Sequence, residues 1–397
     1  MTRKRLIYVG SGGGGAFQDA SGIYAHFSTG LLLDYFAQEY DEVCWCAPKE
    51  SVKTPNLAFK LPENVVHVPM PKSSSTLAAT LKLKGYSQAW KDALKEPGDL
   101  FIRGIFPGAA ELYKLCVKKG FHPLHWLVGN PIALLQSHKR SGFVMDRLAL
   151  CYAKNWERVV QNGVDQTQGA FLCFGQELYA RMEGHKRYNL VAAPILESQI
   201  SLREDTCQGD VIRVLFVGFI RPEKGVQYLV EALPHLRCRR RVELVCVGPK
   251  NDRYAEYNAL LDAKIKELGL EDRVSFPGYM DQNQIFEVMR SCDVFVLPSL
   301  SEGAPYVVVE SRSQGLPTIA TAVGGIPTSI NDGEDGLLVP PKDPVAIADA
   351  IDCVIEDEAL RKDLVEKGYA KVRELTFDKF VKKIVGILDE LNGRGQQ

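Results

Sequence analysis

Short apolar runs alternate with helical patterns along most of the chain, and this alternation constrains the fold more than any other feature. Alternation of this kind favours parallel strands joined by crossover helices, and therefore an α/β fold with doubly wound sheets. The alternation of strands and helices occurs in two separate parts of the chain. We expect strands at residues 6–10, 42–48, 100–104, 124–129 and 170–175, and again at 211–220, 242–248, 274–279, 294–298 and 318–322.

A chain of 397 residues is too long for one hydrophobic core, so we expect at least two domains. The polar stretch Glu197–Asp210 shows no apolar period and is the predicted boundary. The domains would then span 1–200 and 211–375. The last helix, about 377–392, carries an apolar stripe, and we expect it to pack against another element, with the first domain as the candidate.

The other helices that we expect follow from apolar periodicity and from capping residues. Asp281 and Gln284 match an N-cap and its capping-box partner, and the helix that they open should end near Cys292. Further predicted helices lie near 23–36, 109–119 and 227–235.

The total charge of −1 conceals an asymmetry, because residues 1–200 carry a net charge of +6 and the rest carries −7. A basic half suggests an anionic partner, such as an acidic membrane surface, a phosphate-bearing lipid or an acidic glycan, although ordinary solubility charge also fits. The Lys and Arg residues are dispersed and no nucleic-acid-binding motif accompanies them, so we do not expect a nucleic-acid partner.

No run of eighteen or more apolar residues occurs, and the start MTRKR leads into a short strand-like run instead of a signal-peptide core. We therefore expect a cytoplasmic protein, with peripheral contact at the inner face of the membrane as an option. Residues 76–94 are basic and carry an apolar stripe that contains Tyr86 and Trp90. The stripe fits an interfacial helix or burial on the first sheet, and burial is favoured because most helices of such domains are amphipathic.

The ten cysteines are spread along the chain without a CxxC pair, so we expect reduced and mostly buried thiols. Cys44 and Cys46 would point to the same face of a strand, where they could bind metal. No second Cys/His cluster has ligand spacing, which favours core packing for both residues.

Two glutamates, Glu302 and Glu310, flank a turn between a predicted buried strand and a predicted helix that Gly315 would close. Pro305 suits the first turn of that helix. The helix N-terminus would present backbone amides and a positive dipole end, which favour an anion. The residues of the turn are Gly303, Ala304, Pro305 and Tyr306.

A carboxylate at each end and an anion site between them suit a ligand with phosphate in the middle and hydroxyl groups at both ends. A nucleotide sugar has that layout. For an isolated pair of glutamates, solvated surface acids would be the better explanation. Three further features on the chain change that balance.

The first feature is the segment 218–225, which follows a predicted strand and places Arg221 and Lys224 at its carboxyl end, where ligands bind in open α/β sheets. Two cations there could neutralise a diphosphate leaving group, although a charged surface loop is the simpler reading of these residues alone. The second feature is the glycine turn 323–328, in which Pro327 marks a predicted helix start.

The third feature is the loop Gly10–Gly15, where backbone could approach a pyrophosphate closely. The loop satisfies GxGxxG, the dinucleotide fingerprint. In that fingerprint the helix starts within the glycines, whereas here the next helical pattern starts near Ile23, so we interpret the segment as a long loop at the domain mouth. The loop residues that we assign to a donor are Gly12, Gly13 and Gly14.

Five ordered blocks of the second half resemble the second domain of glycosyltransferase family 4: GFIRPEKG, GYMDQNQI, PSLSEGAPYVVVE, GLPTIATAVGGIP and NDGEDGLLVPPKD. Members of this family are retaining enzymes of GT-B fold, with two Rossmann-like domains that face a cleft. The resemblance covers about residues 211–355, and the first half resembles the family's acceptor-side domain more loosely.

The resemblance implies that Glu310 binds the ribose hydroxyls, Glu302 the hydroxyls of the donor sugar, and Lys224 a phosphate. Catalytic roles would fall to Lys224, Arg221 and Glu302. No divalent metal or other cofactor is implied, because Lys, Arg and helix dipoles would neutralise the departing diphosphate of a UDP- or GDP-sugar. The remaining residues implied in donor binding are Gly218, Tyr279, Met280, Gly303, Ala304, Pro305 and Tyr306.

Three positions depart from the family pattern. Phe219 stands where the family has an arginine, so Arg221 would be its substitute, and Thr328 ends a motif that usually ends in Glu. After the fourth strand, residues 127–130 lack the His that contacts the donor in many members. These departures leave the acceptor side open, and the candidates there are Asn130, Arg103 and His26.

The leading hypothesis is a retaining glycosyltransferase that moves a hexose from a nucleotide sugar to a glycan or lipid-linked acceptor, in cell-surface polysaccharide or glycolipid biosynthesis. A non-catalytic nucleotide-sugar-binding protein is the second hypothesis. An NAD-type dehydrogenase, based on the loop Gly10–Gly15, is the third.

Overall fold

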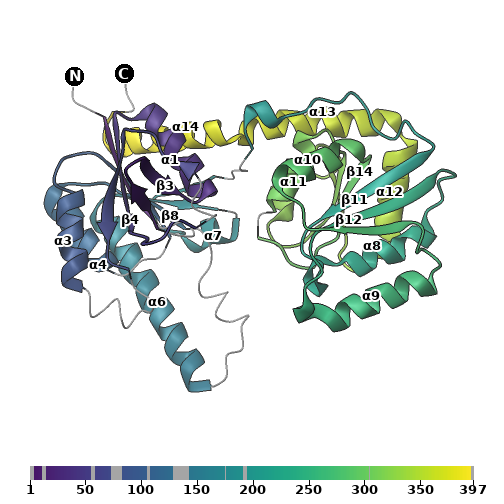
Figure 1. Ribbon diagram of the computed structural model, residues 1–397, viewed down its shortest axis with the longest axis horizontal. Helices are drawn as coiled ribbons and strands as arrows, with labels where there is room; N and C mark the ends of the chain where they lie inside the picture. The colour runs from purple at the N-terminus through teal and green to yellow at the C-terminus, as the bar shows by residue number, and fades with distance from the viewer. Residues whose placement is uncertain are drawn as a thin grey trace. The chain divides into compact units, whose positions relative to one another are not determined.

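A computed structural model describes residues 4–10, 15–54, 59–72, 83–104, 108–127, 143–174, 176–190, 195–303 and 305–394. Its contacts divide the chain into two compact units: unit 1 is Met1–Leu190 with Phe380–Gln397, and unit 2 is Val191–Lys379. The division therefore falls ahead of the polar stretch 197–210 where we expected it. Each unit is built on one parallel sheet, which confirms the predicted α/β class (Figure 1).

The sheet of unit 1 has seven parallel strands in the order β10-β9-β8-β7-β1-β4-β6. The chain moves in one direction from β1 to β6 and in the other from β7 to β10, so the switch point lies between β1 and β7. A small antiparallel sheet, β2-β3-β5, accompanies it. The strands are β1 (Arg5–Val9), β2 (Phe17–Asp19), β3 (Gly22–Ala25), β4 (Glu42–Pro48), β5 (Phe59–Lys60), β6 (Val65–Met70), β7 (Asp99–Arg103), β8 (Leu124–Leu127), β9 (Ala170–Cys173) and β10 (Arg187–Asn189).

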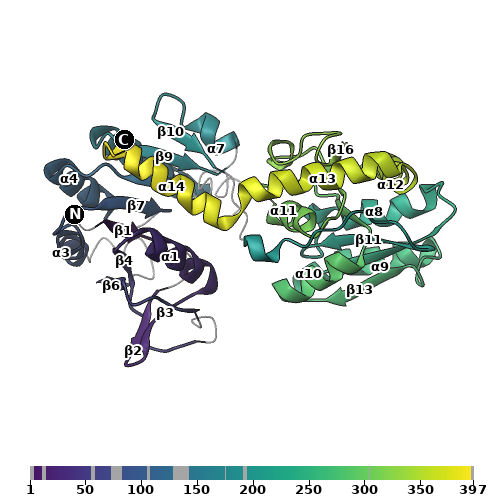
Figure 2. The ribbon, with the colours of Figure 1, turned by 90° about the horizontal axis from the view of Figure 1, so that it is seen from above.

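Helices cover both faces of the unit 1 sheet, with α1 and α14 on one face and α3, α4 and α6 on the other (Figures 1 and 2). The last helix, α14, packs Phe380 against Trp126 of β8, with ring centroids 5.5 Å apart. The helices are α1 (Phe27–Glu39), α3 (Leu83–Ala93), α4 (Ala109–Lys119), α6 (Phe143–Gln166), α7 (Gln176–Arg181) and α14 (Phe377–Leu391).

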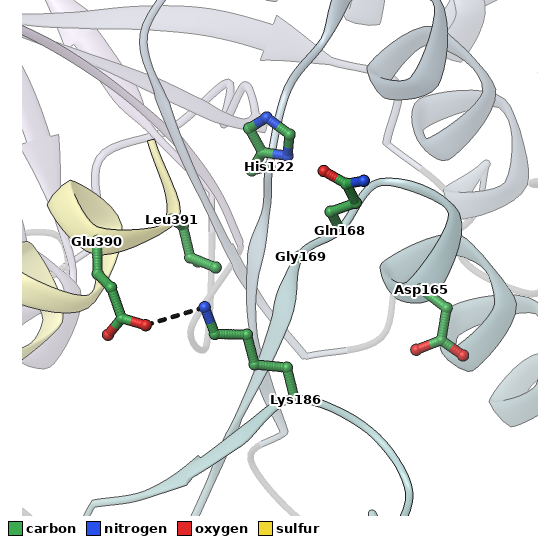
Figure 3. A pocket seen from close by; sticks show the side chains of 7 residues that line it. All are labelled: His122, Asp165, Gln168, Gly169, Lys186, Glu390 and Leu391. Atoms are coloured by element: carbon green, nitrogen blue, oxygen red, sulfur yellow. Dashed lines mark ion pairs between the residues drawn. The ribbon is translucent and has the colours of Figure 1, made fainter. Parts of the chain in front are cut away.

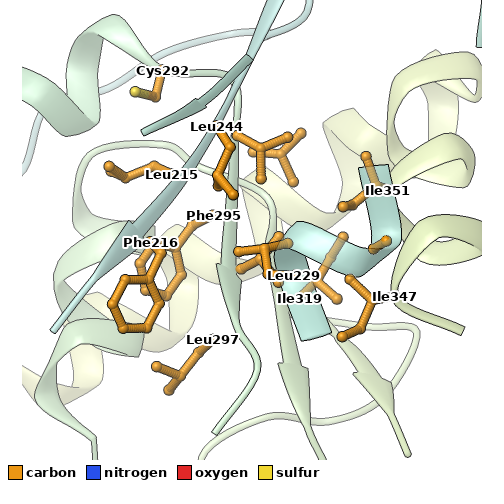
Figure 4. Close-up of a cluster of buried hydrophobic side chains, with 14 of the residues drawn as sticks. Leu215, Phe216, Leu229, Leu244, Cys292, Phe295, Leu297, Ile319, Ile347 and Ile351 are labelled. Atoms are coloured by element: carbon orange, nitrogen blue, oxygen red, sulfur yellow. The ribbon is translucent and has the colours of Figure 1, made fainter. Parts of the chain in front are cut away.

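The sheet of unit 2 has six parallel strands in the order β13-β12-β11-β14-β15-β16, with its switch point between β11 and β14. Because helices cover both faces, its central strands are mostly apolar, and all four residues of β14 are buried. Figure 4 shows part of the core beneath these helices, including Phe216, Phe295 and Ile347. The strands are β11 (Val211–Val217), β12 (Arg241–Val247), β13 (Val274–Gly278), β14 (Val294–Leu297), β15 (Thr318–Thr321) and β16 (Leu337–Val339).

Several helices of unit 2 begin where the sequence predicts. The Asp281 side chain accepts a hydrogen bond from the Gln284 amide and the Gln284 side chain accepts one from the Asp281 amide, which confirms the capping box. Asp343 caps α12 in a similar way, ahead of Pro344. The helices are α8 (Val226–Ala232), α9 (Ala255–Glu267), α10 (Gln282–Ser291), α11 (Tyr306–Ser313), α12 (Pro344–Glu356) and α13 (Glu358–Leu375), with single 3-10 turns at Glu197–Gln199, Pro222–Lys224, Leu233–His235, Asp252–Tyr254 and Ile326–Thr328.

The structure corrects two sequence expectations and confirms a third. Residues Gly22–Ala25 do not begin a helix, because they pair with β2 and β5 as strand β3. The short strands β6, β10 and β16 were not expected, and each lies at an edge of its sheet. Tyr86 and Trp90 of α3 are buried in the core of unit 1, which confirms the favoured prediction of burial for this part of 76–94; residues 76–82 lie outside the described residues.

All ten cysteines are free, and seven of them are buried. Cys44 and Cys46 both belong to the core of unit 1, as predicted. Burial raises the pKa of the Cys44 thiol to about 11. These thiols therefore serve packing.

A buried ion pair fixes α11 to the loop before β16. The Arg312 guanidinium donates to Asp335 Oδ1 at 2.7 Å and to the Ser329 carbonyl at 2.9 Å, and the two charged side chains are 1% and 5% exposed. Asp335 also accepts from the Asn331 amide. Burial lowers the pKa of Arg312, and Asp335 opposes that shift. Because the pair is so buried, removing one partner leaves a charge without compensation.

We expect the change Asp335→Ala to destabilise unit 2 by about 3–5 kcal/mol, because it leaves the Arg312 guanidinium in the core without a counter-charge. Urea denaturation followed by circular dichroism measures the loss. The four tryptophans all lie in unit 1, so their fluorescence reports that unit separately. As a control, Lys367→Ala removes an exposed ion pair with Asp363 and should leave the midpoint nearly unchanged. Equal effects of the two changes would contradict this role of the buried pair.

Candidate functional site

The candidate site lies at the carboxyl edge of the unit 2 sheet, beside the switch point between β11 and β14. The loops that follow these strands contact each other, since the Leu300 amide donates to the Glu223 carbonyl at 2.8 Å. Gly225 has a φ of +69°, and a Cβ there would lie 2.0 Å from the Pro298 carbonyl oxygen. Only glycine permits this approach of the two loops.

The two loops bring Lys224 and Glu302 together. Lys224 Nζ lies 2.5 Å from Glu302 Oε1, and the two side chains are only 15% and 10% exposed. The Ser299 hydroxyl donates to the same oxygen, Oε1, at 2.7 Å. Both contacts therefore engage one carboxylate oxygen, and Oε2 is the atom of Glu302 that is left to accept from a ligand.

The backbone at Glu302 is held as firmly as its side chain. The Gly325 amide donates to the Glu302 carbonyl at 3.0 Å. Gly324 has a φ of +53°, and a Cβ there would lie 1.9 Å from the same carbonyl oxygen. The glycine turn after β15 thus supports the Glu302 loop. The turn continues as a 3-10 turn of three residues, so the α-helix start that we expected at Pro327 is wrong.

Glu310 lies in the second turn of α11, as its position in the sequence predicts. Gln282 Nε2, at the start of α10, donates to Glu310 Oε1 at 3.1 Å. Burial raises the pKa of Glu310, and the Gln282 hydrogen bond opposes the shift. The carboxylate is therefore held away from bulk water without a cation within ion-pair distance among the described residues.

The start of α11 lies between the two glutamates. Tyr306 is the first helical residue, so Pro305 is the N-cap and not part of the first turn. The N-cap residue Pro305 makes no side-chain hydrogen bond to this helix end. Gly303 is exposed in the loop before it. Ala304 lies outside the described residues.

Arg221 and Phe219 follow β11 on the same edge. The Arg221 guanidinium lies 5.9 Å from the centre of the Phe219 ring, and its Nε lies 3.8 Å from Glu223 Oε2. Phe219 is 57% exposed. Gly218 ends the strand at φ +159°, near extended backbone. Arg221 thus lies on the same loop as Lys224.

The loop after β13 carries Tyr279 and Met280. Tyr279 is 78% exposed, whereas Met280 packs partly against the unit 2 core. Both residues stand at the carboxyl end of their strand and immediately before α10, the helix that carries Gln282.

The predicted residues of unit 1 are placed less completely. Gly12, Gly13, Gly14 and Asn130 lie outside the described residues. His26 is the N-cap position of α1, after β3 of the small sheet, and its side chain makes no cap bond. Arg103 is the last residue of β7, at the switch point of the main sheet.

Sequence reasoning missed two residues of the site in unit 2. Ser299 stands three positions before Glu302 in the same loop, and that short spacing is a signal that could have identified it. Gln282 is 28 positions from Glu310, so nothing local in the sequence links them.

A separate pocket in unit 1 does not offer a comparable site. Its lining includes His122, Asp165, Lys186 and Glu390 (Figure 3). Its residues His122, Gly169 and Lys186 come shortly before β8, β9 and β10, at the opposite edge from the one where parallel sheets bind ligands. Its charged groups are already paired, since Lys186 bonds Glu390 at 2.9 Å and Asp165 bonds His185 at 2.8 Å.

Among the described residues, no group of three or more His, Cys, Asp and Glu could hold a metal ion. No helix in the same part of the chain is long and apolar enough to cross a membrane.

The part of the chain that carries this site resembles known proteins. Residues 201–371 match the family described as Glycosyl transferases group 1. A D-inositol 3-phosphate glycosyltransferase of Acidothermus cellulolyticus is 37% identical over 180 residues, which are 44% of this chain and 40% of that protein. The chain therefore spans less than half the length of this curated relative.

Two solved structures resemble nearly the whole chain. Sucrose-phosphate synthase of Thermosynechococcus elongatus has a TM-score of 0.69 at 18% identity, over 98% of this chain and all of that one. Anabaena HepE in complex with UDP has a TM-score of 0.63 at 18% identity, over 98% of this chain and all of that one. At this identity the likeness shows the fold alone. Residues 201–371, which include the site, thus match a family of glycosyltransferases, and the two solved structures share the fold of nearly the whole chain.

Proposed function

We propose that this protein is a retaining hexosyltransferase of glycosyltransferase family 4 that uses a UDP- or GDP-linked sugar. Its acceptor would be a glycan or a lipid-linked glycan in cell-surface polysaccharide or glycolipid biosynthesis, on the cytoplasmic side of a membrane. The observation that carries the proposal is the placement of Lys224, Glu302 and Glu310 on one sheet edge of the domain that matches the group 1 family.

Each group of this edge suits one part of a nucleotide sugar. Lys224 and Arg221 supply positive charge to the diphosphate, and the uncapped start of α11 adds backbone amides. The free oxygen of Glu302 accepts from hydroxyls of the donor sugar. Glu310 accepts from the two ribose hydroxyls, and a carboxylate that accepts two such bonds gives charge-assisted strength at fixed geometry.

The chemical step needs no redox partner. The acceptor hydroxyl oxygen bonds to the anomeric carbon on the face from which the diphosphate leaves, as the bond from that carbon to the phosphate oxygen breaks. The hydroxyl proton passes to the leaving phosphate. Because Lys224 and Arg221 neutralise the charge that develops on the diphosphate, the proposal requires no divalent metal.

The names of two similar proteins agree with this proposal. HepE is described in complex with UDP, and the Acidothermus relative is named for transfer to an inositol phosphate. The first name includes a nucleoside diphosphate, as the proposed donor does, and the second includes a hydroxyl-bearing inositol phosphate, as the proposed acceptor would. The position of Phe219, which is exposed where the family has an arginine, instead favours a binding protein without catalysis, and a transfer assay separates the two.

The first test is a thermal-shift screen of UDP- and GDP-sugars. A cognate donor at a hundred times its dissociation constant should add about 2.7 kcal/mol of stability to wild-type protein. Lys224→Ala should bind that donor more weakly and lose transfer, because the diphosphate then lacks its main cation. Wild-type transfer by the Lys224→Ala variant would contradict the site, and donor binding without transfer or donor hydrolysis by wild-type protein would favour the non-catalytic alternative.

The second test concerns Glu310. The change Glu310→Gln should weaken UDP binding about tenfold to a hundredfold, because hydrogen bonds to a charged group contribute about 1.5–3 kcal/mol. Isothermal titration at pH 7 measures this effect. Glu287→Gln, an exposed change on α10, is the matched control and should bind UDP like the wild type.

The same variant gives a pH signature. Burial raises the pKa of Glu310 above its ordinary value of 4.5, so its contribution to stability is present below pH 4.5 and is lost as pH rises through the raised pKa. Glu310→Gln cannot ionise and should therefore unfold at a higher temperature than the unliganded wild type at pH 7. The difference should shrink as pH falls toward 4.5. A variant that is less stable than wild type at pH 7 would contradict this reading.

The third test concerns Ser299, which we place as a positioning residue. Ser299→Ala removes the hydroxyl that fixes Glu302 Oε1, so the turnover number for transfer should fall about tenfold while UDP affinity stays unchanged. Ser301→Ala changes an exposed serine of the same loop and is the control. Equal turnover of the two variants would show that Lys224 alone orients Glu302.

A further inference from the structure

Arg103 occupies the place in unit 1 that corresponds to the ligand edge of a parallel sheet. It ends β7 at the switch point, and β1 on the neighbouring side leads into Gly10. A Cβ at Gly10 would lie 3.0 Å from the Cβ of Arg103. Glycine at this position therefore leaves room for the stem of Arg103 at the edge of the sheet.

The guanidinium of Arg103 is held in place by aromatic rings. It lies 4.6 Å from the centre of the Trp126 ring on the adjacent strand. Trp126 is itself packed against Phe380 and against Phe101, at 5.5 and 6.0 Å between ring centroids. Burial raises the pKa of Tyr8, and the nearby Arg103 charge opposes that shift. A cation that stacks on a fixed ring keeps its in-plane N–H groups available.

Arg103 has no carboxylate partner among the described residues, whereas three other arginines of unit 1 have one. Arg5 pairs with Glu42 at 2.7 Å, Arg181 pairs with Glu157 at 2.6 Å, and Arg394 pairs with Asp99. Among the described residues no Asp or Glu lies within ion-pair distance of Arg103, which is partly exposed. A fixed guanidinium without a counter-charge at the ligand edge is a site for an anion.

The charge of the whole unit points the same way. Unit 1 holds 26 Lys and Arg against 18 Asp and Glu, a net charge of +8, whereas unit 2 holds 22 against 31, a net charge of −9. The proposed donor site lies in the acidic unit, where Lys224 and Arg221 supply local positive charge to the diphosphate. The donor therefore does not account for the positive charge of unit 1. The excess positive charge of unit 1 would attract a different anion.

We propose that the acceptor carries a phosphate group and that Arg103 binds it. This inference rests on the proposed function, since it concerns the second substrate of the same reaction. The planar guanidinium matches two phosphate oxygens with parallel hydrogen bonds, and the dianionic charge of a phosphomonoester gains more from a basic unit than the single charge of a carboxylate does. The phosphate belongs either to a soluble sugar phosphate or to a lipid headgroup.

The experiment titrates glucose 6-phosphate into the full chain at saturating UDP, so that the donor site is already occupied. We expect Arg103→Met to bind the sugar phosphate at least tenfold more weakly than wild type and Arg103→Lys to lie between them, because lysine keeps the charge without the planar fork. Lys118→Gln removes an exposed charge on α4 and should bind like the wild type. Glucose itself should show no dependence on Arg103.

A second arm identifies the source of the phosphate. Sedimentation with vesicles that contain phosphatidic acid, a phosphomonoester lipid, compared with phosphatidylcholine vesicles, tests a lipid headgroup in the same variants. Binding that depends on Arg103 in either arm supports the proposal, and the arm that responds names the source. Binding that is independent of Arg103 in both arms, or tighter binding of glucuronate than of glucose 6-phosphate, overturns it.

The outcome is separable from that of the proposed function. UDP titration of the same proteins tests the donor site, and Arg103→Met should bind UDP like the wild type. Wild-type protein that binds the sugar phosphate through Arg103 but does not bind UDP would contradict the proposed function and leave only the phosphate binding by Arg103 standing.

Discussion

The site of unit 2 depends on a close approach of three loops at one sheet edge. Gly225 brings the loop after β11 against the Pro298 carbonyl, and Gly324 brings the loop after β15 against the Glu302 carbonyl. Without these two contacts, the Lys224 ammonium and the Glu302 carboxylate would not meet, since they are 78 positions apart in the chain. The ion pair is thus a product of backbone geometry, and Ser299 then selects which carboxylate oxygen remains free.

In the unliganded site, the carboxylates of Glu302 and Glu310 have different surroundings. At one end Glu302 is neutralised by Lys224, so its burial carries little penalty. At the other end Glu310 has only the amide of Gln282, and burial raises its pKa. A carboxylate buried without a cation destabilises the unliganded protein, and hydroxyl groups of a bound ligand would stabilise it by donating hydrogen bonds. Binding sites often lower stability in this way.

Much of the fold could be predicted because its signals are local. The capping box at Asp281, the strand β4 and the helix α4 follow from residues within a few positions of one another, and each was found at its predicted bounds. Two local predictions were wrong. Residues 22–25 became strand β3 through pairing with β2 and β5, and Pro305 stayed outside α11 although its residue type suits the first turn.

The sequence alone determined the two α/β halves, the edge of the sheet that would carry the site, and the residue types that a phosphate and two sets of hydroxyls require. These follow from apolar periodicity and from the rule that parallel strands end at a common edge. Only the tertiary structure decided which groups touch. The pairing of Gln282 with Glu310 and the stacking of Arg103 on Trp126 join residues from different elements. Such contacts depend on how strands and helices pack, and no local pattern encodes that packing.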